Sequence, residues 1–247
     1  MKNIINLKTS LLTVFLISSV FLPAQEIGFY HRVNEPAEKS NNELELFIKR
    51  NAENHLVLEK GLIKRFKQNQ SSESELLNIV RKSVEALLAS SWNIEETGKL
   101  IEVLTKSIIK SVTNPKINAD KILENFSFDL VFNAYKWSNS NKISFDSTIY
   151  ETTSALGRGL IQAAHDSNEL SDLNIYSTYL GQGTATAGFI LSRRLNQDEP
   201  ILSGKIIGGL TSGYLSKGKL LGIKTDSLIS SSLRFISSEL IKKSGGT

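Results

Sequence analysis

Ile143-Ser144-Phe145-Asp146 places an aliphatic residue and a capping residue directly before a helix-length amphipathic block, and this arrangement decides the fold class. Ser, Thr, Asn and Asp are the residues that satisfy free backbone N–H groups at a helix start. The arrangement recurs at residues 117–120, 170–172 and 223–226, with looser members at Ile94 and Ile201. Successive starts lie 22 to 31 residues apart. The chain is therefore predicted to be one helix after another, joined by short polar turns.

Residues 1–24 have the pattern of a secretory signal peptide. Lys2 and Lys8 supply the positive start, an apolar run extends from Leu11 to Leu22, and Pro23-Ala24 follows it. This run is shorter than the about 20 residues that span a bilayer, which favours a cleaved signal over a membrane anchor. We therefore expect export to the periplasm or the extracellular space.

Composition excludes one class of partner and one kind of stabilisation. Removal of residues 1–24 leaves 27 basic and 25 acidic residues, a net charge of +2. Such a chain has no basic stripe for a phosphate backbone, so nucleic acid is excluded as a partner. The chain contains no Cys, so an exported fold must be stabilised by burial, without disulfides.

We expect one domain. Residues 25–41 carry little periodicity and are predicted to be a flexible lead-in, residues 42–243 a single all-helical domain, and residues 244–247 a tail. About eight sequential amphipathic helices are predicted, arranged as an up-and-down bundle or as a layered helical array. A right-handed stack of helix pairs is the alternative, and the unequal spacing of the helix starts counts against a regular solenoid.

Two segments are harder to interpret. Residues 42–68 are predicted to be a first helix, although Asn51 and His55 interrupt its apolar face. Residues 126–130 alternate as a strand would, yet Ile117 and Ile122 have the spacing of a hydrophobic staple around a helix start. This spacing favours a helix.

Small residues replace large ones on the apolar stripes after residue 141. Glycine inside a helix costs about 0.5–1 kcal/mol relative to alanine, so a series of glycines requires an offsetting gain, and close approach of neighbouring helices supplies one. The tightest packing is therefore expected in the C-terminal half. Candidates for packing or ligand contact are Gly157, Gly183, Ala187, Gly204, Gly208, Gly209, Gly213, Phe126 and Phe128.

The glycine spacing has a second interpretation. Gly204 and Gly208 lie four residues apart, as in helices that associate inside membranes, which would indicate a bilayer-inserting or self-associating segment. Lys205, Lys217 and Lys219 interrupt this stretch, so packing inside a soluble bundle is favoured.

Residues 213–219 match the first seven positions of a phosphate-binding loop. The hydroxyl residue that would ligate Mg²⁺ is replaced by Leu220, and the preceding residues have a helical pattern where a strand is required. A helix that ends at glycine and is followed by a turn is the favoured explanation, so no nucleotide is expected.

Residues for catalysis are few. His165 and Asp166 are the weak catalytic candidates, and a histidine at a helix C-terminus is already favoured by the helix dipole. No HExxH or related spacing occurs, so neither a metal nor a cofactor is expected. Asp129 is the acid that could be buried with a shifted pKa, although a solvent-facing Asp is favoured over a catalytic one.

These observations leave three functional hypotheses. The favoured one is an exported, non-enzymatic interaction or assembly protein, which binds an unknown protein or self-associates. The second is a carrier of lipids or amphiphiles, with a cavity between the Phe-rich fourth helix and the glycine-lined helices, and with a lipid or membrane surface as its partner. The third is a hydrolase or lyase that uses His165.

Overall fold

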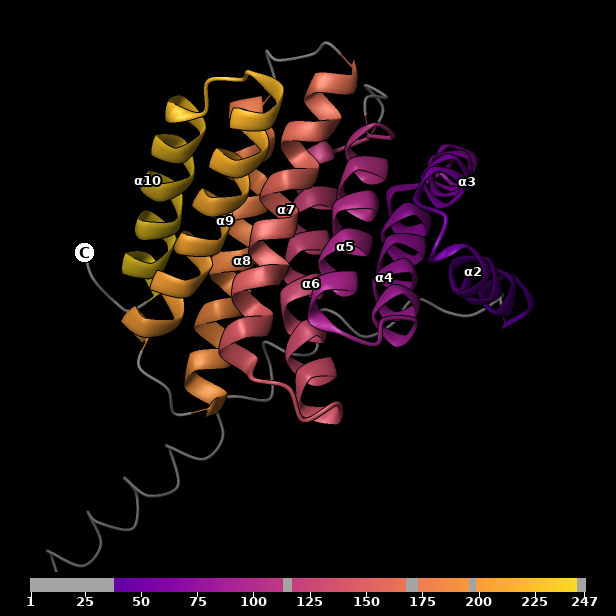
Figure 1. The fold of residues 1–247 in the computed structure, drawn as a ribbon, viewed down its shortest axis with the longest axis horizontal. Coiled ribbons are helices and arrows are strands. Elements are labelled where there is room, and N and C mark those ends of the chain that lie inside the picture. Colours follow the sequence, from indigo (N-terminus) through magenta and orange to yellow (C-terminus); the bar gives the residue numbers. More distant parts are fainter. Residues whose placement is uncertain (1–37, 113–116, 168–172, 196–198, 244–247) are drawn as a thin grey trace, which may run out of the picture. The chain divides into compact units, whose positions relative to one another are not determined.

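The computed structural model describes residues 38–112, 117–167, 173–195 and 199–243. Over these residues the chain forms nine α-helices and no strand (Figure 1). The all-α prediction is confirmed, and the predicted count of about eight helices is one short. The predicted signal peptide, the predicted helix start at residues 170–172 and the predicted tail lie outside the described residues.

Most of the helices begin where the sequence provides a capping residue. In chain order they are α2 (Glu38–Asn51), α3 (His55–Gln68), α4 (Glu73–Ala89), α5 (Ile94–Ile109), α6 (Ala119–Ser140), α7 (Phe145–Ser167), α8 (Leu173–Leu195), α9 (Glu199–Leu221) and α10 (Asp226–Lys243).

Side-chain caps are present at three of the described helix starts. Asn93 accepts a hydrogen bond from the backbone N–H of Glu96 at 2.8 Å, directly before the helix start indicated by Ile94. Asn54 and Ser72 accept equivalent bonds at the starts of α3 and α4. Gly222, with a φ of +69°, follows α9 in the left-handed conformation that glycine adopts at helix ends.

The single first helix predicted over residues 42–68 is wrong. The chain turns at Ala52–Asn54, and two helices, α2 and α3, take its place. The side chain of Asn54 accepts a hydrogen bond from a free backbone N–H group at the start of α3. The polar interruption of the apolar face therefore marks the start of a second helix. The segment at residues 126–130 is helical and lies within α6, as the staple spacing predicts.

The helices from α3 onward form two layers, and alternate helices lie side by side (Figure 1). One layer contains α3, α5, α7 and α9, and the other contains α4, α6, α8 and α10. Contacts within the layers are the most extensive, above all those of α7 with α9, α5 with α7 and α6 with α8. Of the two predicted arrangements, the layered helical array is therefore the one that forms.

Glycine permits the closest contacts within these layers. A Cβ atom added at Gly183 of α8 would overlap the carbonyl oxygen of Glu124 and the hydroxyl of Ser127 on α6. A Cβ at Gly213 of α9 would overlap the carbonyl oxygen of Ser154 on α7. The helix backbones therefore touch where larger residues would hold them apart.

Two glycine substitutions distinguish this packing role from a general effect on helix propensity. Gly183→Ala is expected to lower the free energy of unfolding by about 1–3 kcal/mol, because the added methyl group has no space. Gly204→Ala in α9 is the matched control. No heavy atom lies within 4 Å of its added Cβ, so it is expected to raise stability by about 0.5–1 kcal/mol. Chemical denaturation of dilute protein measures both, and equal effects would contradict the assignment.

Candidate functional site

Most of the predicted small-residue candidates lie inside helix–helix contacts. A Cβ at Gly157 would approach the carbonyl oxygen of Leu210 to 2.8 Å, and one at Gly209 would approach that of Tyr150 to 2.5 Å. Gly183 and Gly213 are enclosed in the same way, and Ala187 is fully buried. These residues are part of the packed array, where a ligand has no access to them.

The two aromatic candidates have separate positions. Phe126 is fully buried in the core, whereas Phe128 is half-buried and stacks on Phe132 with ring centroids 5.8 Å apart. The contact of Gly183 with Glu124 closes the space between α6 and α8 at the place where a carrier would need its cavity. No observation of this interface favours a lipid carrier.

His165 and Asp166 are not hydrogen-bonded to each other. The Nδ1 atom of His165 lies 3.6 Å from the nearest carboxylate oxygen of Asp166, beyond hydrogen-bonding distance. The carboxylate instead contacts Lys106 at 2.6 Å and Lys110 at 2.9 Å, and it accepts a hydrogen bond from Gln162 at 2.7 Å. Asp166 therefore orients α5 against α7 and does not hold the imidazole.

Glu59 completes this charge cluster from α3. Its two oxygens contact Lys106 at 2.7 Å and Lys110 at 3.1 Å, so two lysines lie between two carboxylates and the four charges cancel. Burial opposes ionisation of Asp166, but Lys106, Lys110 and Gln162 outweigh it and hold the pKa of Asp166 well below its ordinary value. A carboxylate with such a pKa is a poor general base at neutral pH.

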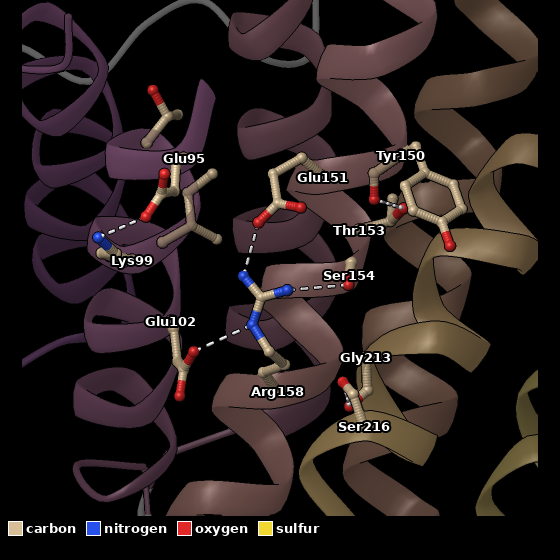
Figure 2. Close-up of polar contacts among 12 residues, drawn as sticks. Glu95, Lys99, Glu102, Tyr150, Glu151, Thr153, Ser154, Arg158, Gly213 and Ser216 are labelled. Carbon is tan, nitrogen blue, oxygen red and sulfur yellow. Dashed lines mark hydrogen bonds and ion pairs between the residues drawn. The ribbon is translucent and has the colours of Figure 1, made fainter. Parts of the chain in front are cut away.

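A second charge cluster joins α5, α7 and α9. Figure 2 shows its contacts between α5 and α7. Arg158 donates from Nε to Glu102 at 3.1 Å, from Nη2 to Glu151 at 2.6 Å and from Nη1 to the hydroxyl of Ser154 at 3.0 Å. Lys217 contacts the other oxygen of Glu102 at 2.5 Å. Desolvation works against the charge on Arg158, but Glu151 and Glu102 prevail and raise its pKa. This cluster is also neutral and already paired.

Two buried polar groups outside the clusters also have partners. Burial raises the pKa of Asp129, and Arg81 opposes this from a distance of 3.4 Å. Tyr214 is fully buried, and its hydroxyl lies 3.3 Å from that of Ser232, which lies 2.7 Å from that of Ser177. These hydroxyls connect α8, α9 and α10 through the interior, and burial raises the pKa of Tyr214.

The segment that resembles a phosphate-binding loop is helical. Residues 213–219 lie within α9, which continues to Leu221. Backbone N–H groups inside a helix are bonded to carbonyl groups of the preceding turn, so they cannot surround a phosphate as a loop does. The turn predicted after a glycine is present, but it begins only at Gly222.

One outer surface of α9 is hollow and partly apolar, and we call it the α9 edge. The hollow is open, has a volume of about 670 Å³ and is lined by Gly204, Ile207, Gly208, Thr211, Ser212, Leu215, Ser216 and Lys219. Leu215 is 50% exposed, and a Cβ at Gly204 would meet no heavy atom within 4 Å. Of the predicted candidates, Gly204 and Gly208 line the α9 edge.

The sequence interpretation missed the large residues of this surface. Ile207 and Leu215 are not among the predicted candidates, and the buried stripe of α9 consists of Ile206, Leu210 and Tyr214. A usable signal was present, because α9 carries apolar residues on every side. A helix that is apolar all round is normally enclosed by protein on every side.

Metal sites, membrane-spanning helices and similarity to known proteins give no further indication of function. Among the described residues, no three acidic, histidine or cysteine side chains are grouped to hold a metal ion. No helix within the described ranges is long and apolar enough to cross a membrane. No protein-family model, curated protein or solved structure matches the chain.

The Asp166 cluster predicts how stability depends on pH. Its pKa is lowered in the folded state, so its stabilising effect is present above the ordinary value of 3.8 and is lost as the pH falls below it. Asp166→Asn is expected to lower the unfolding temperature at pH 7 by about 2–4 °C, or roughly 1 kcal/mol at this chain length. It is also expected to reduce the loss of stability between pH 5 and pH 2.5.

Thermal unfolding at pH 7, 5 and 2.5 measures this effect. Asp146→Asn is the matched control, because Asp146 pairs with Lys205 and its side chain is 54% exposed. An exposed pair contributes about 0–1 kcal/mol, so the control should change little at any pH. Identical curves for the two variants would contradict the assignment.

Proposed function

We propose that the protein is an exported, non-enzymatic assembly protein that binds a helix of its partner along the α9 edge. The observation that carries this proposal is the exposed apolar surface of α9 at the open end of its layer. Leu215 is 50% exposed there, and Ile201, which lies on the same side of the helix, is 57% exposed. Apolar surface that remains together on one face is typical of an interaction site.

The neighbouring helix strengthens this interpretation. Arrays of helices need a polar outer face at their ends to remain soluble. α10 has one, because its exposed positions include Ser227, Ser230, Arg234 and Ser237. The α9 edge, which closes the other layer, instead presents Gly204, Ile207 and Leu215. The layer α3–α5–α7–α9 therefore stops at a surface with the composition of an interior helix contact.

A helix is the occupant that this surface fits. On its other side α9 meets α7 through Gly209 and Gly213, which contact the backbone at Tyr150 and Ser154. Gly204 and Gly208 repeat the four-residue spacing of that pair on the open surface. A partner helix with an apolar stripe would continue the layer with the same kind of close contact.

Two further features support a non-enzymatic, exported protein. Four of the carboxylates, Glu59, Asp166, Glu102 and Glu151, are held in the two neutral clusters around Asp166 and Arg158, where they connect helices. Export is supported by the signal-peptide pattern of residues 1–24.

Site-specific photo-cross-linking in living cells tests the proposal. A photoreactive residue at Thr211, on the α9 edge, is expected to give cross-links to residues of a helix, identified by mass spectrometry. The same residue at Ser230, on the polar face of α10, is the control and should give few. Equal cross-linking from the two positions, or none from Thr211, would overturn the proposal.

A substitution on the same surface provides an independent check. Leu215→Lys places a charge on the α9 edge and is expected to reduce cross-linking from Thr211 at least tenfold, because burying an unpaired charge is unfavourable. The fold should be retained, since residue 215 is half exposed. Circular dichroism confirms retention, and undiminished cross-linking in the folded variant would contradict the role of Leu215.

A further inference from the structure

A second hollow lies between the C-terminal parts of α4 and α6, in the layer that does not contain α9. Its volume is about 350 Å³, which lies within the range of small-molecule sites. Leu88 and Ala89 of α4 contribute apolar surface. The polar residues around it include Glu85, Asn133, Lys136, Trp137 and Asn141. A hollow of this size and composition suits a small polar molecule.

The indole N–H of Trp137 lacks a partner within the protein. Trp137 is only 7% exposed, and a buried tryptophan N–H normally has a hydrogen-bond partner. In the described part of the chain, no atom accepts a hydrogen bond from it. Over the same residues, Nε2 of His55 is the one fully buried side-chain nitrogen or oxygen without a partner, so the indole nitrogen still reaches solvent. Because Trp137 lines the hollow, its N–H is available there to an acceptor on a ligand.

Two amide side chains complement this donor with acceptors. Asn133 donates from Nδ2 to the carbonyl oxygen of Asp129 at 2.8 Å, and Asn141 donates from Nδ2 to that of Trp137 at 2.8 Å. The helix therefore occupies a donor of each amide, while both amide oxygens can still accept a hydrogen bond. A ligand that satisfies Trp137 and the two amides has to accept and donate hydrogen bonds, as hydroxyl groups do.

The charges at the hollow favour a neutral ligand. Glu85 and Lys136 line it with opposite signs, so their charges cancel. The ammonium group of Lys136 lies 5.1 Å from the ring centroid of Phe132, and the face of the ring attracts it there. An anion in the hollow would be repelled by Glu85, and a cation would be repelled by Lys136.

We propose that this hollow binds a small, neutral molecule rich in hydroxyl groups, of the class of sugars. Its hydroxyls supply an acceptor for Trp137 and donors for Asn133 and Asn141 without adding a charge. The hollow is open to water, and a few hydrogen bonds give little net free energy, so the dissociation constant is expected to be on the order of 1–10 mM. The site lies apart from the α9 edge, so it does not depend on the partner proposed there.

Heteronuclear NMR of the isotope-labelled protein tests the proposal, because the chain has two tryptophans. Trp92 is 58% exposed and is not one of the residues that line the hollow, so its indole signal is the internal control. The protein is titrated with glucose, galactose, mannose and N-acetylglucosamine, each to about 100 mM, well above the expected dissociation constant. At least one sugar is expected to shift the indole signal of Trp137 in a saturable way and to leave that of Trp92 in place.

Variants identify the groups that bind the sugar. Asn141→Ala is expected to weaken binding about three- to tenfold, because it removes one acceptor. Asn125→Ala is the matched control. Asn125 makes the same kind of bond, from Nδ2 to the carbonyl oxygen of Lys121 at 2.7 Å, but does not line the hollow, so its loss should leave binding unchanged. Trp137→Phe removes the N–H and should weaken binding to a similar extent, as measured from the backbone amide signal of Asn133.

Charged probes distinguish the class of ligand. Putrescine, a small dication, and glutarate, a small dianion, are titrated in the same way. A saturable shift of the Trp137 signal with either of them, but with none of the sugars, would overturn the choice of a neutral ligand. No shift with any probe, equal shifts of both indole signals, or equal effects of Asn141→Ala and Asn125→Ala would overturn the site itself. Circular dichroism confirms that each variant folds, and if Trp137→Phe does not fold, Asn141→Ala decides.

Discussion

Direct backbone contact between alternate helices is the interaction on which the whole array depends. Gly183 allows α8 to touch α6, and Gly213 allows α9 to touch α7. Glycine weakens an isolated helix by about 1 kcal/mol, so these helices depend on one another for stability more than on their own propensity. Small residues let neighbouring helices of the second half approach closely, and Gly204 on the α9 edge is a glycine whose open side has no such neighbour.

Charge has a structural role in the same array. The clusters around Asp166 and Arg158 each bring two cations and two carboxylates together across three helices, and each is neutral. A paired, half-buried group is poorly suited to accept or donate protons, since both charged forms are stabilised. The residues that would attract attention in a search for catalysis therefore hold α3, α5, α7 and α9 in register. The exposed surface of α9 is correspondingly apolar in part, with Ile207 and Leu215 among its residues.

Local signals were enough for much of the fold. The all-α class and the cap at Asn93 follow from residues close in sequence, because capping and amphipathic periodicity act within one or two turns. The prediction of one helix over residues 42–68 missed the break after Asn51. Polar residues that interrupt an apolar face give the same sequence pattern whether the helix continues or a new one begins. The absence of a hydrogen bond between His165 and Asp166 has a geometric reason. Neighbouring residues on a helix point in directions about 100° apart, so Asp166 faces α5 and His165 does not follow it.

The sequence by itself determined that the chain is helical, where many of its helices begin, and that its second half packs through small residues. Tertiary structure alone decided which helices become neighbours. The sequence is the same whether a glycine faces the backbone of another helix or the solvent. That decision separates Gly183 and Gly213, which are closed by α6 and α7, from Gly204 on the α9 edge, which is open. The difference depends on where a layer of helices stops, which is a property of the assembled array.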